Sequence, residues 1–121
     1  MTESMLVLIA GPYRSGTGGD PARIAANLRR LEAASAPLYR LGHVPMIGEW
    51  VALPTIRELG GDAEKDGEPD VMYETASRLL EHCDAVLRLP GESAGADEDV
   101  RIARERGLPV YTEIGQVPRA S

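Results

Sequence analysis

The sequence predicts an α/β layer fold with a parallel sheet, and three observations lead to that prediction. Short apolar runs without polar alternation, such as residues 5–11 (MLVLIAG), are typical of strands buried on both faces. Amphipathic helical segments separate these runs, so strand and helix patterns alternate along the chain. Glycine-containing loops follow the predicted strands, and the carboxyl ends of parallel strands are where such sheets bind ligands.

The individual elements follow from local composition. Residues 20–42 form a helical segment that Asp20 caps, Pro21 opens and Gly42 ends, and Pro37 is expected to kink or divide it. The other predicted elements are a strand at 5–11, a strand at 43–47, a short helix at 48–60 broken near Pro54, a helix at 71–83, a strand at 84–91, a helix at 95–107 and a strand at 108–113.

Two segments fall outside this alternation. The strongly polar stretch at 61–70 (GDAEKDGEPD) is predicted to be a surface loop. The tail at 115–121 (GQVPRAS) is expected to have little to pack against. A chain of 121 residues suffices for one domain with one core, so residues 1–121 are assigned to a single domain.

Composition excludes several classes of function. The net charge of -6 argues against binding a nucleic-acid polymer, although one arginine and a few backbone N–H groups suffice for a single nucleotide. The single cysteine, Cys83, forms neither an internal disulfide nor a metal site by itself. Without an apolar run of roughly 18 residues or a signal peptide, we expect a cytoplasmic protein with no membrane contact.

The loop at 11–21 (GPYRSGTGGDP) is a candidate anion site. A glycine-rich turn between strand and helix exposes backbone N–H groups, and Arg14 can clamp a phosphate or carboxylate. The spacing matches neither the dinucleotide fingerprint nor the P-loop. A flexible loop with a solvated arginine is the alternative, and the position directly after the first strand favours ligand binding.

Helical geometry separates the acidic residues near the last predicted helix. If that helix begins near Ala96, a narrow face of small residues contains Ala96, Val100 and Ala103. Glu98 points nearly opposite to this face, whereas Asp99 lies about 60° from its centre. Asp99 is therefore expected to look across the end of the sheet, and Asp97 and Glu98 are expected to be solvated. The helix dipole favours acids in a first turn whatever their function.

Three further side chains have two interpretations each. Ser93 either caps the helix or donates to a phosphate together with the N–H groups of Gly95 and Ala96. Trp50 either supplies a flat wall for a base or packs in the core or a subunit interface. His43 follows a helix-ending glycine, where a structural role is expected.

Four segments together resemble the nucleoside 2-deoxyribosyltransferase superfamily, in particular its small bacterial and phage-type domains, and more distantly the nucleoside 5′-monophosphate N-glycosidases. They are LVLIAGPYRSG at 6–16, Asn27 in the first helix, GHVPMIGEW at 42–50 and CDAVLRLPGESAGADEDVRIARERGLPVY at 83–111. The resemblance implies a single-domain flavodoxin-like Rossmann fold with four to five parallel strands flanked by helices. It also implies a homodimer or homotetramer that cleaves an N-glycosidic bond without a metal or organic cofactor.

In this superfamily a carboxylate, normally of glutamate, attacks the anomeric carbon of the sugar. It lies four residues after the glycine of a Gly-Ala motif and four before a helix alanine, and these spacings select Asp99. The family's second carboxylate, an aspartate eight residues before the Asp of Cys-Asp, corresponds to Ala76. The resemblance therefore implies that Asp99 is one methylene shorter than the family's glutamate and that the second carboxylate is missing from position 76.

Two functional hypotheses follow from these residues. The first is an enzyme that acts on a nucleoside or nucleotide, with Asp99 as nucleophile. The substrate-binding candidates are Gly11, Tyr13, Arg14, Ser15, Gly16, Trp50, Ser93, Gly95 and Ala96. The alternative is a non-catalytic nucleotide-binding or sensor module on the same scaffold, and a structural oligomer with a vestigial pocket is a third possibility.

Overall fold

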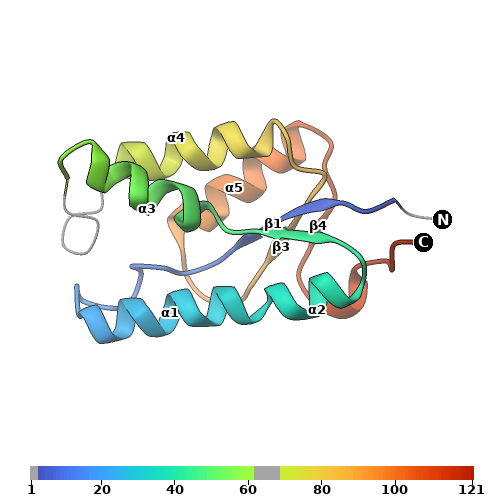
Figure 1. Ribbon diagram of the computed structural model, residues 1–121, viewed down its shortest axis with the longest axis horizontal. Coiled ribbons are helices and arrows are strands. Elements are labelled where there is room, and N and C mark those ends of the chain that lie inside the picture. The colour runs from blue at the N-terminus through green and yellow to red at the C-terminus, as the bar shows by residue number, and fades with distance from the viewer. Residues whose placement is uncertain (1–2, 62–68) are drawn as a thin grey trace.

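The computed structural model describes residues 3–61 and 69–121, which form three layers, with a parallel sheet between two layers of helices (Figure 1). The four strands are β1 (Leu6–Ala10), β2 (Val44–Met46), β3 (Ala85–Arg88) and β4 (Val110–Tyr111), in the order β2-β1-β3-β4. All pairings are parallel, which confirms the predicted fold class. Because β2 and β3 lie on opposite sides of β1, the strand order reverses between β1 and β3.

Helices cover both faces of the sheet (Figure 1). On one face lie α1 (Pro21–Ala33) and α2 (Ser35–Arg40); on the other lie α3 (Gly48–Glu58), α4 (Pro69–Leu80) and α5 (Ala94–Glu105). A 3₁₀ turn, η1 (Ile114–Gln116), follows β4. Most of the polar loop predicted at 61–70 lies outside the described residues. Within residues 3–61 and 69–121, no helix is long and apolar enough to cross a membrane.

The core consists of two halves, one on each face of the sheet. Side chains alternate along β1, so Val7 and Ile9 pack in the half that includes Leu31 of α1, and Leu8 and Ala10 pack in the other. All four of these β1 side chains are buried. The continuous apolar run at the start of the chain is therefore a strand covered on both faces, as predicted.

The first helical segment divides as expected from its proline. Asp20 caps α1, because its Oδ1 accepts a hydrogen bond of 3.0 Å from the backbone N–H of Ala22. The helix ends at Ala33, and α2 begins at residue 35, so Pro37 lies in the first turn of the second helix. Proline is tolerated in a first turn because the N–H that it lacks has no partner there.

The predicted break near Pro54 is wrong, since α3 is continuous from Gly48 to Glu58. Pro54 is exposed, whereas Ala52 and Ile56 on either side of it are buried. Burial of this apolar side of the helix offsets the hydrogen bond that the proline removes.

The expectation that the tail has little to pack against is also wrong. Val117 is buried in the core half that contains Val7 and Ile9. The backbone N–H of Ala120 donates a hydrogen bond of 2.8 Å to the carbonyl of Leu41. Isolated contacts of this kind dock the tail, and they create no periodic pattern in the sequence.

His43 joins three parts of the chain beneath this tail. The ring is buried, and its Nδ1 accepts a hydrogen bond of 3.0 Å from the backbone N–H of Met5. Its Nε2 donates to the carbonyl of Pro118 at 2.6 Å. Because one ring nitrogen accepts while the other donates, the imidazole is neutral here. His43 therefore has the structural role expected from the sequence.

We predict that His43→Ala lowers the free energy of unfolding by about 2 kcal/mol or more, because it leaves buried polar groups unpaired and creates a cavity. His82→Ala is the matched control; His82 is exposed, so its loss is expected to cost less than about 0.5 kcal/mol. Urea unfolding of the two variants and the parent measures the difference. Equal midpoints for the two variants would contradict the structural role of His43.

Candidate active site

A cavity of about 190 Å³ opens where the strand order reverses. Its floor is the end of β1, and its walls come from the β1–α1 loop and from α3, α4 and α5. This is the position at which open parallel sheets bind ligands. The polar side chains that line it are Tyr13, Arg14, Ser15, Glu49, Tyr73, Ser93 and Asp99.

Most of the residues predicted from the sequence meet in this cavity. Asp99 lines it, as do the binding candidates Gly11, Tyr13, Arg14, Ser15, Ser93, Gly95 and Ala96. Gly16 lies in an adjoining depression that shares Ser15 with the cavity. Residues far apart in the sequence therefore converge because their loops follow neighbouring parallel strands.

Trp50 does not line the cavity. Its Nε1 donates a hydrogen bond of 2.8 Å to the carboxylate of Glu32 on α1, and its side chain is 40% exposed. Glu49, one residue earlier in the first turn of α3, does line it. Successive helical residues point about 100° apart, and here Glu49 faces the cavity while Trp50 points toward α1. Trp50 therefore does not form a wall for a base in this cavity.

Hydrogen bonds from α1 and from within the loop hold the β1–α1 loop. The side-chain amide of Asn27 donates to the carbonyl of Tyr13 at 2.8 Å. The buried hydroxyl of Thr17 donates to the carbonyl of Arg14 at 2.6 Å. Arg14 is partly buried and lines the cavity, so its side chain is not fully solvated in this structure.

The β3–α5 loop lies directly against the β1–α1 loop. Gly91 has φ +118°, and a Cβ atom there would lie 2.7 Å from Cγ of Pro12. Glycine is required because a side chain would be strained by the backbone and would clash with the proline. This close approach brings Ser93 beside the end of β1.

Ser93 has the capping role. The helix begins at Ala94, slightly before the predicted start, and the Oγ of Ser93 accepts a hydrogen bond of 3.1 Å from the N–H of Ala96. The residue is buried and also lines the cavity. A hydroxyl that accepts in this way still has a proton to donate, so capping leaves the predicted contact with a phosphate open.

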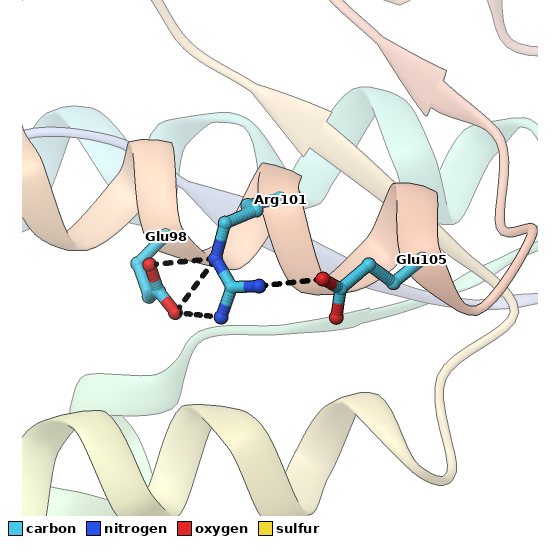
Figure 2. Close-up of polar contacts among 3 residues, drawn as sticks. All are labelled: Glu98, Arg101 and Glu105. Atoms are coloured by element: carbon cyan, nitrogen blue, oxygen red, sulfur yellow. Dashed lines mark hydrogen bonds and ion pairs between the residues drawn. The ribbon is translucent and has the colours of Figure 1, made fainter.

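The acidic residues of α5 face different surroundings, as the helical geometry predicts. Glu98 binds the guanidinium of Arg101, which also donates to Glu105 at 2.7 Å, and these residues follow one another along the helix (Figure 2). Asp97 is exposed, yet it accepts a hydrogen bond of 3.0 Å from Arg88. Asp99 lines the cavity.

Arg88 fixes the loop that carries Ser93. Besides binding Asp97, its guanidinium donates to the carbonyls of Leu89 and Gly91. The exposed Asp97 is therefore not simply solvated, because it anchors the arginine that shapes this turn.

The cavity changes the acidity of its carboxyl groups. Burial raises the pKa of Asp99 to about 7, helped by the negative charges of Glu49 and Glu98 and opposed by the positive charge of Arg88. Burial also raises the pKa of Glu49, and a hydrogen bond from its own backbone N–H partly lowers it. Two carboxyl groups with perturbed acidity in one cavity are typical of a catalytic site.

The thiol of Cys83 is excluded as a nucleophile. Burial and the charges of Asp84 and Asp99 raise its pKa to about 11, so it stays protonated at neutral pH.

Glu49 is the site residue that sequence reasoning missed. The segment 42–50 is part of the resemblance, but no role was assigned to this carboxylate. The available signal was its position directly after a predicted strand and at the start of a helix. Ala76 of α4, where the superfamily is expected to have aspartate, lines the same cavity. The second carboxylate at this cavity is therefore that of Glu49 on α3, the helix that packs against α4.

Comparison with protein-family models, curated proteins and solved structures finds no match to this chain. Within the described part of the chain, no group of three or more His, Cys, Asp and Glu side chains is placed to hold a metal ion.

We predict that Asp99→Asn stabilises the protein at high pH. The folded-state pKa of Asp99 lies above its ordinary value of 3.8, so the protonated group stabilises the fold at low pH and this contribution is lost as pH rises through about 7. The variant should melt several degrees above the parent at pH 8 and close to it near pH 4. Glu105→Gln, exposed on the same helix, is the control. A gain at pH 8 no larger than that of the control would contradict the burial of the charge.

Proposed function

We propose that this protein cleaves the N-glycosidic bond of a nucleoside or nucleoside 5′-monophosphate, by hydrolysis or transfer, with Asp99 as nucleophile. The observation that carries the proposal is the placement of Asp99. Its carboxylate shares a cavity at the strand-order reversal with Arg14, Ser93 and a second carboxylate. A partly buried carboxylate is poorly solvated and is held at a fixed position by its helix, and both properties favour nucleophilic attack.

The surroundings of Asp99 suit a sugar carrying a phosphate. Arg14 supplies a guanidinium, which binds phosphate oxygens in pairs. The N-terminus of α5, with Ser93 and Gly95 at the cavity, adds the hydroxyl proton of Ser93 and a positive helix-dipole end; the N–H of Ala96 is already bound to the Oγ of Ser93. We assign the phosphate or sugar hydroxyl groups to this side of the cavity.

The size of the cavity favours the sugar and the scissile bond as its occupants. Its volume of about 190 Å³ is below the roughly 300–1,000 Å³ typical of pockets for drug-sized ligands. A base or phosphate therefore extends beyond it, and the adjoining depression lined by Gly16, Arg23 and Asn27 offers one direction. We also propose a homodimer or homotetramer, in which a neighbouring subunit completes the pocket.

Asp99→Asn is expected to lower the release of free base at least about 100-fold, because an amide does not attack the anomeric carbon. The assay incubates the protein with ribo- and deoxyribonucleosides and their 5′-monophosphates and follows free base by chromatography. Glu105→Gln is the control on the same helix and should keep most of the activity, because Glu105 is exposed and does not line the cavity.

Base release that persists in Asp99→Asn would exclude Asp99 as nucleophile. Absence of release by the parent, together with a thermal shift on adding a nucleotide, would favour the non-catalytic binding module instead.

Arg14→Met is expected to discriminate between substrates. If Arg14 binds the phosphate, the variant loses about tenfold or more in kcat/KM for the monophosphate and little for the nucleoside, because one charge-assisted hydrogen bond contributes about 1.5–3 kcal/mol. Arg29→Met, on the exposed surface of α1, is the control. Equal losses for both substrates would assign Arg14 to the sugar or to the loop structure.

A further inference from the structure

We infer that Glu49 is the second catalytic carboxylate, which gives its proton to the departing base while Asp99 attacks the sugar. This inference rests on the proposed N-glycosidic cleavage, and it assigns to α3 a role that the superfamily resemblance places on α4. It also explains how the reaction can proceed although Ala76 has no ionisable side chain.

The geometry brings the two carboxylates together from different elements. Asp99 enters from α5 and Glu49 from the first turn of α3, and both line the same cavity. They are close enough for the charge of Glu49 to act on the ionisation of Asp99. Ala76, with its small side chain, lines the wall that α4 contributes to the same cavity.

The other proton-bearing groups at this cavity suit proton donation less well. Tyr13 and Tyr73 carry phenols that are ordinarily weak acids, and Ser93 carries an alcohol. A general acid works best when its pKa is near the operating pH, which favours a carboxyl group in a cavity that raises its pKa. Glu49 has that environment, since burial raises its pKa.

Charged or titratable groups on several adjacent elements lie near this pair. Glu98 of α5 opposes ionisation of Asp99, and Arg88 of β3 favours it. Arg14 from the β1–α1 loop and Tyr73 of α4 also line the cavity, and the Cys83 thiol before β3 is protonated.

Asp99 and Glu49 do not readily carry negative charges at the same time, because each charge disfavours the other. The pair therefore holds a single proton over a range of pH below about 7. The proton can reside on either acid, and the reactive form has it on Glu49.

The reaction then balances in two steps. First, an Oδ of Asp99 bonds to the anomeric carbon as the C–N bond breaks; the electron pair of that bond goes to the base, and the base takes the proton of Glu49. Next, the Glu49 carboxylate takes a proton from water, and the water oxygen bonds to the anomeric carbon. The ester bond to Asp99 breaks, its electron pair returns to that carboxylate, and Glu49 is protonated again.

The test compares Glu49→Gln with the parent on two substrates. One is the best nucleotide of the panel, and the other is a derivative whose base leaves more easily: the 7-methyl derivative for a purine, or the 5-fluoro derivative for a pyrimidine. The variant should lose about 100-fold or more on the first substrate and less than about tenfold on the second, because general acid catalysis contributes typically 10²–10⁴-fold. Glu58→Gln, exposed at the other end of α3, should match the parent on both.

The pH dependence supplies a second readout. For the parent, the rate should be bell-shaped: at low pH both acids are protonated and no nucleophile exists, and at high pH the pair has lost its last proton, so no acid remains. On the substrate whose base leaves more easily, the pH–rate profile of Glu49→Gln should lose its fall at high pH and keep its fall at low pH. The carboxyl NMR signal of Asp99 should titrate at lower pH in this variant, because a neighbouring negative charge is gone.

Equal losses on both substrates, or an unchanged titration of Asp99, would overturn the role of Glu49 while leaving base release by the parent intact. Failure of the proposed function is a separate result: the parent would then release no base from any substrate of the panel.

Discussion

The parallel pairing of β1 with strands on both of its sides is the constraint on which the rest of this structure depends. Val7–Ala10 pair with residues 85–88 of β3, and the other edge of β1 pairs with β2. All three strands therefore end at one edge of the sheet. Directly after β1, Gly11 lets the backbone lie close to α1 and to the segment after β3, because a Cβ atom there would lie 3.0 Å from Leu31 and 3.2 Å from Leu89. The chain segments that follow these strands consequently surround one cavity.

Burying carboxylates at this edge costs stability, whereas the segments around His43 are held by satisfied hydrogen bonds and buried side chains. Asp99 and Glu49 both have raised pKa values because their charged forms are poorly solvated. Far from the cavity, His43, Val117 and the carbonyl of Pro118 bind the N-terminus, β2 and the tail together. Such a division, with poorly solvated carboxyl groups at the site and satisfied packing elsewhere, is common where activity requires a destabilised group.

The sequence predicted the site where local periodicity determined side-chain direction. Asp99 was placed correctly because Ala96 and Ala103, which define the inner face of α5, are buried as the helical wheel requires. The sequence could not predict in the same way which of Trp50 and Glu49 faces the cavity. The direction of each depends on where α3 begins and on its angle to α1, and contacts distant in sequence, such as that of Trp50 with Glu32, decide both.

The sequence by itself determined the alternation of strands and helices, the division of the first helical segment near Pro37 and the inward direction of Asp99, because these depend on neighbours within a few residues. Only the tertiary structure decided the continuity of α3 through Pro54, the docking of the tail and the entry of Glu49 into the cavity of Asp99. Each of these depends on burial against segments distant in the chain, and such contacts leave no periodic signal in the sequence.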